Sequence, residues 1–209
     1  MTTRASQVGG FNKALRANEG RYKVALDEDA MARLASYYEL LLEWNPRLHL
    51  VAPCSPTEFA TRHVLESLLL LPHLPAAARI ADVGSGGGLP IIPALIARAD
   101  IRATLIESSQ KKAVFLREAL RATRTSEQAT VVAERFEDTP TPVVDYVTCR
   151  ALDRFSEMLP KLIAWAPPHR TLLLFGGDKL IRQIEPWGLN FSSVKIPGSE
   201  RRWLLIADC

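Results

Sequence analysis

Apolar side chains recur at helical spacing in two stretches of the first third of the chain. The first stretch follows Asp27, which can cap a helix that runs to about Asn45, and Pro46 is expected to stop it. The second stretch is Thr57–Leu71, and the two prolines that follow it are expected to form the connection to the next segment. Residues 1–24 are polar and contain three glycines, so we expect them to be loosely ordered.

After these helical stretches, short apolar runs alternate with helical patterns. Strands are predicted at 79–83, 102–107, 130–133, 143–149 and 170–175, helices at 89–97, 109–122, 155–165 and up to about 184, and a closing hairpin-like pair at 191–196 and 203–207. Such alternation predicts an α/β fold, a Rossmann-like doubly wound and mainly parallel sheet. The closing pair predicts an antiparallel far edge. We therefore divide the chain into an N-terminal helical extension, residues 1–77, and an α/β domain, residues 78–209.

Composition and charge narrow the class of protein only slightly. The 209 residues are 47% apolar, which suits one large domain, or one domain with an extension. The net charge of +3 does not by itself indicate a nucleic-acid partner. Cys54, Cys149 and Cys209 are far apart, and this spacing favours a reducing, cytoplasmic compartment over a disulfide framework or a zinc site. We expect no signal peptide and no membrane-spanning segment.

A glycine-rich loop follows the first predicted strand, and its sequence over residues 82–90 is DVGSGGGLP. Glycine at Gly84, Gly86 and Gly88 allows tight turning and lets a ligand approach the backbone without meeting a Cβ. The helix after the loop would point its free N–H groups at that ligand. Because open α/β sheets bind ligands at the carboxyl ends of their strands, the loop predicts a small-molecule site.

Two cofactors use loops of this kind, and the spacing distinguishes them. The dinucleotide fingerprint G-x-G-x-x-G would need a third glycine where this chain has Leu89. Asp82 followed by G-x-G-x-G instead resembles motif I of class I S-adenosylmethionine-dependent methyltransferases. Glu107 ends the next predicted strand, where an acid can accept both hydrogen bonds of a ribose diol under either reading. The loop and both acids together favour a methyltransferase over a dehydrogenase or an incidental glycine-rich turn.

Further motifs occur in one order along the chain. They are Trp44-Asn45, Arg62-His63, Gly88-Leu89-Pro90 with Pro93, Lys111-Lys112 with Phe115-Leu116, Arg135 with Glu137, and Arg150-Ala151. From about Tyr38 onward, the chain resembles the RsmG (GidB) family of bacterial small-subunit ribosomal RNA methyltransferases. The resemblance implies S-adenosylmethionine as cofactor and methyl transfer to N7 of a guanine in 16S ribosomal RNA or the small ribosomal subunit. We expect a monomer without a metal or a membrane partner.

Five positions depart from the pattern that the resemblance implies. His49-Leu50-Val51 stands where the family usually has Asn-Leu-Thr, and Glu66 stands where it has Asp. Cys149 takes the place of a serine. Gly176 replaces a lysine of the family's basic surface near the site. The last departure bears most directly on how RNA would bind.

The resemblance and the loop together give a set of expected site residues. The expected cofactor-binding residues are Asp82, Gly84, Ser85, Gly86, Gly88, Leu89, Glu107, Arg135, Phe136, Glu137 and Arg150. The expected RNA-binding residues are Lys111, Lys112, Arg150 and Arg201. Guanine N7 carries an in-plane lone pair and needs no deprotonation, so we expect positioning by Arg150 and no general base.

Plainer interpretations stay open for several of these residues. The segment 133–137 can be an ordinary polar loop, and Arg150 can form a salt bridge with a nearby acid. His63 is expected to be structural. For the whole protein, two alternatives remain: a methyltransferase for another RNA or a small molecule, and a non-catalytic RNA- or ribosome-binding protein with the same fold.

Overall fold

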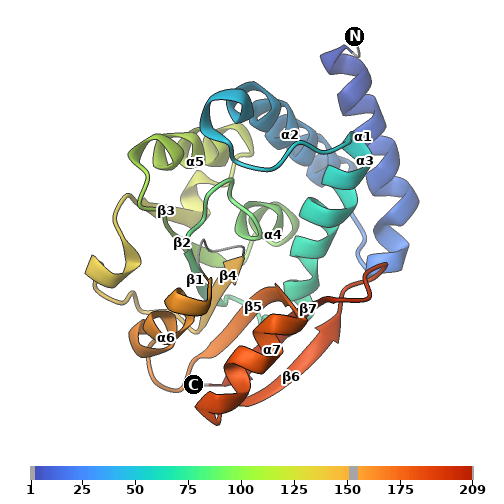
Figure 1. The fold of residues 1–209 in the computed structure, drawn as a ribbon. Helices are drawn as coiled ribbons and strands as arrows, with labels where there is room; N and C mark the ends of the chain where they lie inside the picture. The colour runs from blue at the N-terminus through green and yellow to red at the C-terminus, as the bar shows by residue number, and fades with distance from the viewer. Residues whose placement is uncertain (1–2, 151–154, 209) are drawn as a thin grey trace.

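The computed structural model describes residues 3–150 and 155–208, and a seven-stranded sheet lies at its centre (Figure 1). In spatial order the strands are β3 (Ala129–Val132), β2 (Arg102–Ile106), β1 (Arg79–Val83), β4 (Tyr146–Arg150), β5 (Thr171–Gly177), β7 (Arg202–Asp208) and β6 (Asn190–Lys195). The strands from β3 to β5 pair in parallel, and β7 runs antiparallel to both β5 and β6. The predicted mainly parallel sheet with an antiparallel far edge is confirmed.

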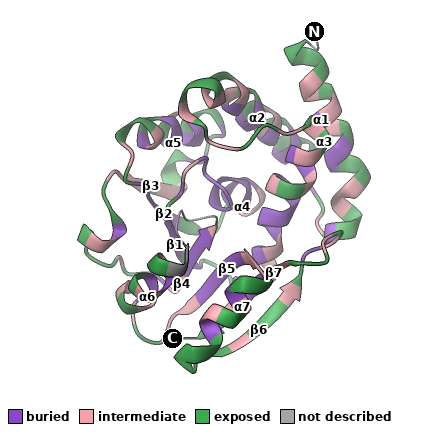
Figure 2. Ribbon diagram, in the orientation of Figure 1, coloured by how far each residue is buried: buried purple, intermediate pink, exposed green. Residues whose placement is uncertain are grey.

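The central strands are largely buried (Figure 2), and their successive side chains point to opposite faces of the sheet, so one strand contributes to two cores. In β1, Ile80 enters a first core, and Ala81 and Val83 enter a second. The helices of the α/β domain are α4 (Ile91–Ala97) and α5 (Gln110–Ala122), which pack into the first core, and α6 (Phe155–Trp165) and α7 (Asp178–Ile184), which pack into the second. Helices therefore cover the sheet on both sides, as the doubly wound pattern predicts.

The N-terminal residues are helical, which corrects the expectation that they are loosely ordered. Helix α1 (Arg4–Asn18) begins at Thr3, whose side chain accepts a hydrogen bond from the Ser6 N–H, and a short 3-10 turn, η1 (Glu19–Tyr22), follows it. Phe11 is fully buried, and its ring stacks on Tyr38 at 4.5 Å between centroids. The expectation failed because the average polarity of this segment hid a few apolar residues that share one helix face.

Helix α2 (Glu28–Leu48) is capped by Asp27, whose carboxylate accepts from the Ala30 N–H at 2.7 Å. The helix does not stop at Pro46, as expected, but continues to Leu48. Proline removes one helical hydrogen bond. Because Pro46 lies in the last turn, only two further residues follow it in the helix, and the remaining bonds hold them. His49 ends the helix in the left-handed conformation, at φ 49°.

The second helical stretch consists of three consecutive segments with different hydrogen-bond patterns. They are an α-helical turn, α3 (Pro56–Glu58), a π-helical segment, η2 (Phe59–Leu65), and a 3-10 segment, η3 (Leu68–His73). Three further 3-10 turns lie later in the chain, at η4 (Ser126–Gln128), η5 (Phe136–Asp138) and η6 (Glu185–Trp187). The helix predicted over Thr57–Leu71 is present, but its change of pitch could not be read from apolar spacing.

Strand β4 begins at Tyr146, three residues later than predicted, because Val143 is 75% exposed and lies outside the sheet. Within the part of the chain that the structure describes, no helix is both long enough and apolar enough to cross a membrane.

Candidate functional site

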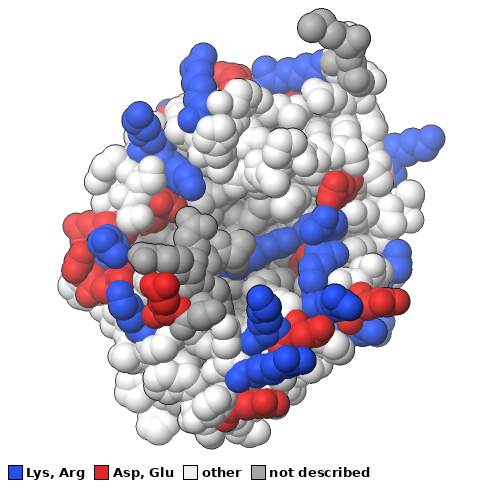
Figure 3. Space-filling view, viewed as in Figure 1, with Lys and Arg blue, Asp and Glu red and all other residues white. Residues whose placement is uncertain are grey.

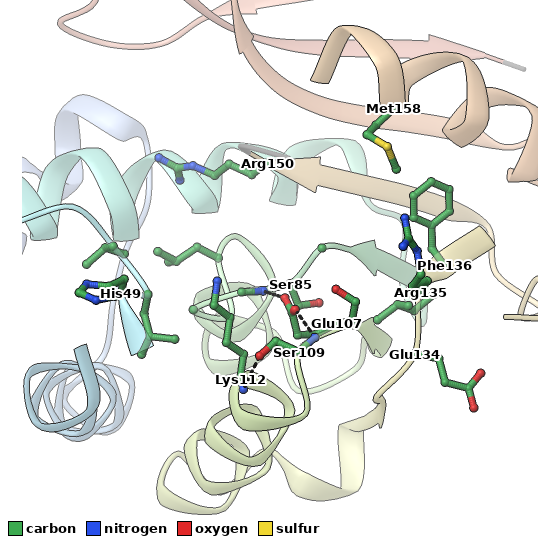
Figure 4. A pocket seen from close by; sticks show the side chains of 18 of the residues that line it. His49, Ser85, Glu107, Ser109, Lys112, Glu134, Arg135, Phe136, Arg150 and Met158 are labelled. Carbon is green, nitrogen blue, oxygen red and sulfur yellow. Dashed lines mark hydrogen bonds between the residues drawn. The ribbon is translucent and has the colours of Figure 1, made fainter. Parts of the chain in front are cut away.

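A cavity of about 750 Å³ opens at the carboxyl ends of the central parallel strands (Figure 4). It lies where the strand order reverses between β1 and β4, the position at which open α/β sheets bind ligands. The lining residues are those of the loop 49–52, His63, residues 84–87 and Leu89 of the glycine loop, residues 106–109 and Lys112 around the start of α5, the segment 134–137, Arg150 and Met158. These residues come from both the helical extension and the α/β domain.

The glycine loop is shaped by hydrogen bonds to its own backbone and to the neighbouring strand. The N–H groups of Gly84 and Ser85 both donate to the Ile106 carbonyl, at 2.9 and 3.1 Å. Gly84, Gly86 and Gly88 all have positive φ, at 71°, 52° and 83°. A Cβ added at Gly88 would lie 2.4 Å from the Cδ1 atom of Ile92, so this position is glycine for packing as well as for conformation.

Glu107 lines the cavity and ties the loop to helix α5. One of its carboxylate oxygens accepts from the Gly86 N–H at 2.9 Å, and the other accepts from the Ser109 N–H at 2.8 Å. Ser109 caps α5 by accepting from the Lys112 N–H. Each carboxylate oxygen has two lone pairs, so the fixed carboxylate keeps acceptor capacity toward the cavity.

Asp82 lies at the end of β1 beneath the glycine loop and is 1% exposed. Among the described residues, neither of its carboxylate oxygens has a hydrogen-bond partner. Burial raises the pKa of Asp82 to about 7; the neighbouring Ser85 side chain acts in the opposite direction, and the nearby charge of Glu107 adds to the rise. A buried acid without a partner is costly, and a ligand that brings hydrogen-bond donors or positive charge to the loop would relieve this cost.

The segment 134–137 forms another wall of the cavity, and Figure 4 shows it across from Arg150. Phe136 is buried and meets Trp165 edge to face, with 5.7 Å between ring centroids. Arg135 is exposed and lies 3.7 Å from Glu137, which also pairs with Lys161 at 3.4 Å. An apolar ring flanked by charged side chains offers a surface for a flat aromatic group.

The side chain of Arg150 lines the cavity at the end of β4, and its guanidinium points to the helical extension (Figure 4). One terminal nitrogen donates to the His63 carbonyl at 3.3 Å and to the Ser67 hydroxyl at 3.1 Å. The other donates to the Arg62 carbonyl and to Glu66, whose Oε2 lies 3.2 Å away. The interpretation of Arg150 as an ion-pair partner is thus realised, and its side chain still forms part of the cavity wall.

Glu66 is 1% exposed and forms a second ion pair with Arg202 of β7. Burial raises the pKa of Glu66, whereas the positive charges of Arg150 and Arg202 lower it. This buried cluster joins the helical extension, β4 and β7 beside the cavity, and removing one partner would leave uncompensated charge.

The structure brings together most of the residues expected at the cofactor site. Nine of them line the cavity, namely Gly84, Ser85, Gly86, Leu89, Glu107, Arg135, Phe136, Glu137 and Arg150. Asp82 is buried beneath the loop, and Gly88 is a buried residue of the loop itself that does not line the cavity. Of the expected RNA-binding residues, Lys112 and Arg150 line the cavity, whereas Lys111 and Arg201 are exposed outside it. Ala151, which follows Arg150 in its motif, lies outside the described residues.

Sequence reasoning did not place the loop 49–52, His63 or Met158 in the cavity wall. The only signal for the loop was its position among the family motifs. His63 packs on Phe59 at 5.3 Å between ring centroids. Burial lowers the pKa of His63 to about 4, and the positive charges of nearby arginines act in the same direction, so its imidazole is neutral at pH 7.

Gly176 has a packing reason in this chain. A Cβ at this position would lie 2.6 Å from the Cδ2 atom of Leu180 and 2.9 Å from its Cβ. The side chain of Leu180, on α7, therefore fills the space beside the end of β5. A lysine there would require α7 to move.

Comparisons with known proteins agree on a methyltransferase family. Residues 30–187 match the GidB family, described as rRNA small subunit methyltransferase G. The chain is 40% identical over 163 residues to the ribosomal RNA small subunit methyltransferase G of Sorangium cellulosum, covering 75% of this chain and 68% of that protein. It is 42% identical over 181 residues to the protein of the same name from Xanthomonas oryzae, covering 83% and 84%. With the Xanthomonas campestris protein, 41% identity extends over 63% of the relative's length.

Solved structures show the same fold at low sequence identity. An RNA methyltransferase from Salinibacter ruber in complex with S-adenosyl-L-homocysteine matches with a TM-score of 0.55 and 16% identity, over 75% of this chain and 93% of that one. The tRNA methyltransferase TrmK of Bacillus subtilis matches with a TM-score of 0.56 and 14% identity, over 69% and 65%. The sheet and its switch point are therefore an arrangement shared with methyltransferases.

Proposed function

The chain belongs to the GidB family of small-subunit ribosomal RNA methyltransferases, and from this premise we propose that it methylates N7 of a guanine in 16S ribosomal RNA. The family is S-adenosylmethionine-dependent, so the cavity at the switch point is the proposed cofactor site. The observation that carries the proposal is that the glycine loop and Glu107 line one cavity, with the buried carboxylate of Asp82 beneath the loop, in a chain of this family.

The residues present fit S-adenosylmethionine. The cofactor has a cationic amino-acid end, a ribose diol and an adenine ring. The unpartnered buried carboxylate of Asp82 favours a positively charged donor nearby, and Glu107 keeps acceptor capacity suited to ribose hydroxyls. Phe136, Arg135 and Glu137 supply the apolar and polar wall suited to adenine. When bound, S-adenosylmethionine supplies an activated methyl group on a positively charged sulfur.

The site residues support a reaction without a general base. Guanine N7 carries an in-plane lone pair, so the protein's task is to orient the acceptor and exclude water. His63 is neutral at pH 7 and its lowered pKa makes it a weak base, which agrees with the interpretation that it is structural. Arg150 supports this part of the site as a positioning residue, because its guanidinium holds the helical segment that carries His63.

Basic side chains offer a path for RNA around the cavity. Figure 3 shows Lys and Arg side chains along the lower right of the hollow, with a few acids among them. We place phosphate contacts at Lys111 and Lys112 on the first turn of α5 and at Arg201 before β7. Arg150 is the remaining expected RNA-binding residue, and its inward hydrogen bonds favour an indirect contribution.

Methyl transfer from radiolabelled S-adenosylmethionine tests the proposal. The purified protein is incubated separately with 16S RNA, with small ribosomal subunits and with a small-molecule extract. All three are prepared from cells that lack the modification. We expect radioactive methyl groups in 16S RNA. Chemical cleavage of the strand at N7-methylguanine should then occur at the labelled position. Glu107→Ala should reduce the transfer by weakening cofactor binding, at a cost of about 1–3 kcal/mol. Label in another RNA or a small molecule, or RNA binding without transfer, would replace the proposal with one of its alternatives.

A further inference from the structure

Tyr37 is a fully buried residue of α2, and it reaches the glycine loop from the helical extension. Its hydroxyl donates a hydrogen bond to the main-chain carbonyl of Gly87, fifty positions later in the chain. Burial raises the pKa of Tyr37 well above its usual range, so the hydroxyl keeps its proton and acts as a donor at physiological pH. Gly87 lines the cavity, so this bond joins α2 directly to the proposed cofactor site.

A second contact from the end of α2 covers the same part of the loop. A Cβ added at Gly87 would lie 3.5 Å from both the Cβ and the carbonyl oxygen of Leu50, so Leu50 packs closely over it. Asn45 fixes the segment around Leu50, because its side-chain amide donates to the Val51 carbonyl at 3.0 Å and accepts from the Val51 N–H at 2.9 Å. One helix therefore supports two adjoining walls of the cavity.

The glycine loop needs such support because glycine gives the unliganded backbone access to many conformations. The α/β domain fixes the first half of the loop, through Ile106 at Gly84 and Glu107 at Gly86. The carbonyl of the next residue, Gly87, is held by the extension. A loop that is ordered before binding loses less conformational entropy when its ligand arrives.

We propose that Tyr37 is a positioning residue of the cofactor site, and that its hydroxyl pre-orders the glycine loop by holding the Gly87 carbonyl. The proposal rests on the proposed function, because the ligand of the loop is S-adenosylmethionine. Helix α2 would then contribute to cofactor binding in addition to packing in the first core.

Tyr37→Phe removes the hydroxyl and leaves the ring, which packs against Phe59 with 6.2 Å between centroids. The matched control is Tyr38→Phe on the same helix, because the buried ring of Tyr38 stacks on Phe11 and Phe59 at 4.5 and 4.8 Å. By calorimetry, Tyr37→Phe should raise the Kd for S-adenosylmethionine and S-adenosylhomocysteine about tenfold, whereas Tyr38→Phe should leave it within about twofold of the unaltered protein. With saturating cofactor, kcat should change little in either variant.

The outcomes separate this inference from the function on which it rests. If the unaltered protein does not bind S-adenosylmethionine, the proposed function fails. If it binds and Tyr37→Phe binds equally well, Tyr37 is structural only and the inference is overturned, even where the variant unfolds at a lower temperature.

A test on the unaltered protein covers the case in which Tyr37→Phe does not fold. Hydrogen exchange is measured with and without S-adenosylhomocysteine. Binding should slow the exchange of amides in residues 34–41 of α2 together with those of the loop 84–89. Slower exchange in the loop without any change in α2 would overturn the inference.

Discussion

Asp82 is a single buried carboxyl group with a large expected effect on the stability of the fold. Its carboxylate is enclosed at the end of β1 without a partner among the described residues, so its neutral form is favoured. The folded state therefore binds a proton more tightly than the unfolded chain, whose aspartate has a pKa of about 3.8. The Asp82 contribution to stability thus decreases as pH rises from about 4 to about 7, and it is constant above that range.

Asp82→Asn should remove this pH dependence. The free energy of unfolding of the variant, relative to the unaltered protein, should rise from near zero at pH 4 and approach about 4 kcal/mol at pH 8. Denaturant unfolding of both proteins at a series of pH values measures the difference. The comparison cancels the opposite contribution of His63, whose lowered pKa makes stability rise with pH between about 4 and 6.5. A difference that does not vary with pH would show that Asp82 is ionised at its ordinary pKa.

Cys149 is a buried residue of β4, in register with Val83 of β1 and Leu174 of β5. Its place next to Arg150 resembles the strand-end cysteine with which some RNA methyltransferases attack carbon six of a pyrimidine. That chemistry needs an accessible thiolate, and Cys149 is 0% exposed. Methylation at N7 needs no covalent intermediate, so a packing role fits the proposed function.

Cys149→Ser should therefore keep most of the methyl-transfer activity, with kcat within about tenfold of the original, or about 1.4 kcal/mol of barrier. Denaturing gels should show no covalent adduct between protein and RNA. A loss of several orders of magnitude in kcat, with folding and cofactor binding intact, would contradict the packing role and indicate 5-methylpyrimidine chemistry.

At the scale of elements, α1 is held by its buried apolar face rather than by its composition. Phe11→Ala should lower the free energy of unfolding by about 3–5 kcal/mol, because the ring is fully enclosed between Tyr38 and Phe59. The control is Lys13→Ala, an exposed change in the same helix, with an expected effect within about 0.5 kcal/mol. Equal effects of the two changes in denaturant unfolding would mean that α1 adds nothing to the core.

Helix α5 carries basic residues at two places, and they differ in their proposed roles. Lys111 and Lys112 lie on its first turn beside the cavity, whereas Arg121 pairs with Glu118 at 3.0 Å further along the helix. Replacing both lysines by glutamine should make RNA binding less dependent on salt. The slope of log K against log salt should decrease by about 1 for each phosphate that the lysines no longer neutralise.

The matched control replaces Arg117 and Arg121 by glutamine, which removes the same charge from the same helix. Filter binding over a salt series should give the original slope for this control. Equal slopes for all three proteins would show that the two lysines are only solvated.

At the scale of the whole molecule, the sequence predicts the α/β part of the fold well. Strand β1 and helix α6 have the predicted bounds, because short apolar runs and amphipathic stretches alternate there without competing signals. The glycine loop and Glu107 were found because adjacent parallel strands bring their carboxyl ends to one edge of the sheet. The division at residue 77 stays a prediction, and the first core contains residues from both sides of it.

The features that were missed depend on interactions between distant residues. An ion pair of Arg150 was considered, but its partner Glu66 lies 84 positions away and was not identified, and the bond from Tyr37 to Gly87 spans 50 positions. No local periodicity encodes such interactions, because each depends on how the extension docks on the sheet. The failed prediction for α1 has the same origin, since its few apolar residues have meaning only beside Tyr38 and Phe59.

The first core contains both Phe11 of α1 and Leu204 of β7, residues nearly two hundred positions apart. During synthesis the helices of the extension leave the ribosome long before the last strands exist. Until β7 has been synthesised and has paired with β5, the apolar surface that it covers stays accessible to proteases and chaperones. A premature stop codon between residues 91 and 202 would therefore leave a polypeptide whose glycine loop is intact in sequence but whose first core lacks Leu204, and we expect it to be degraded.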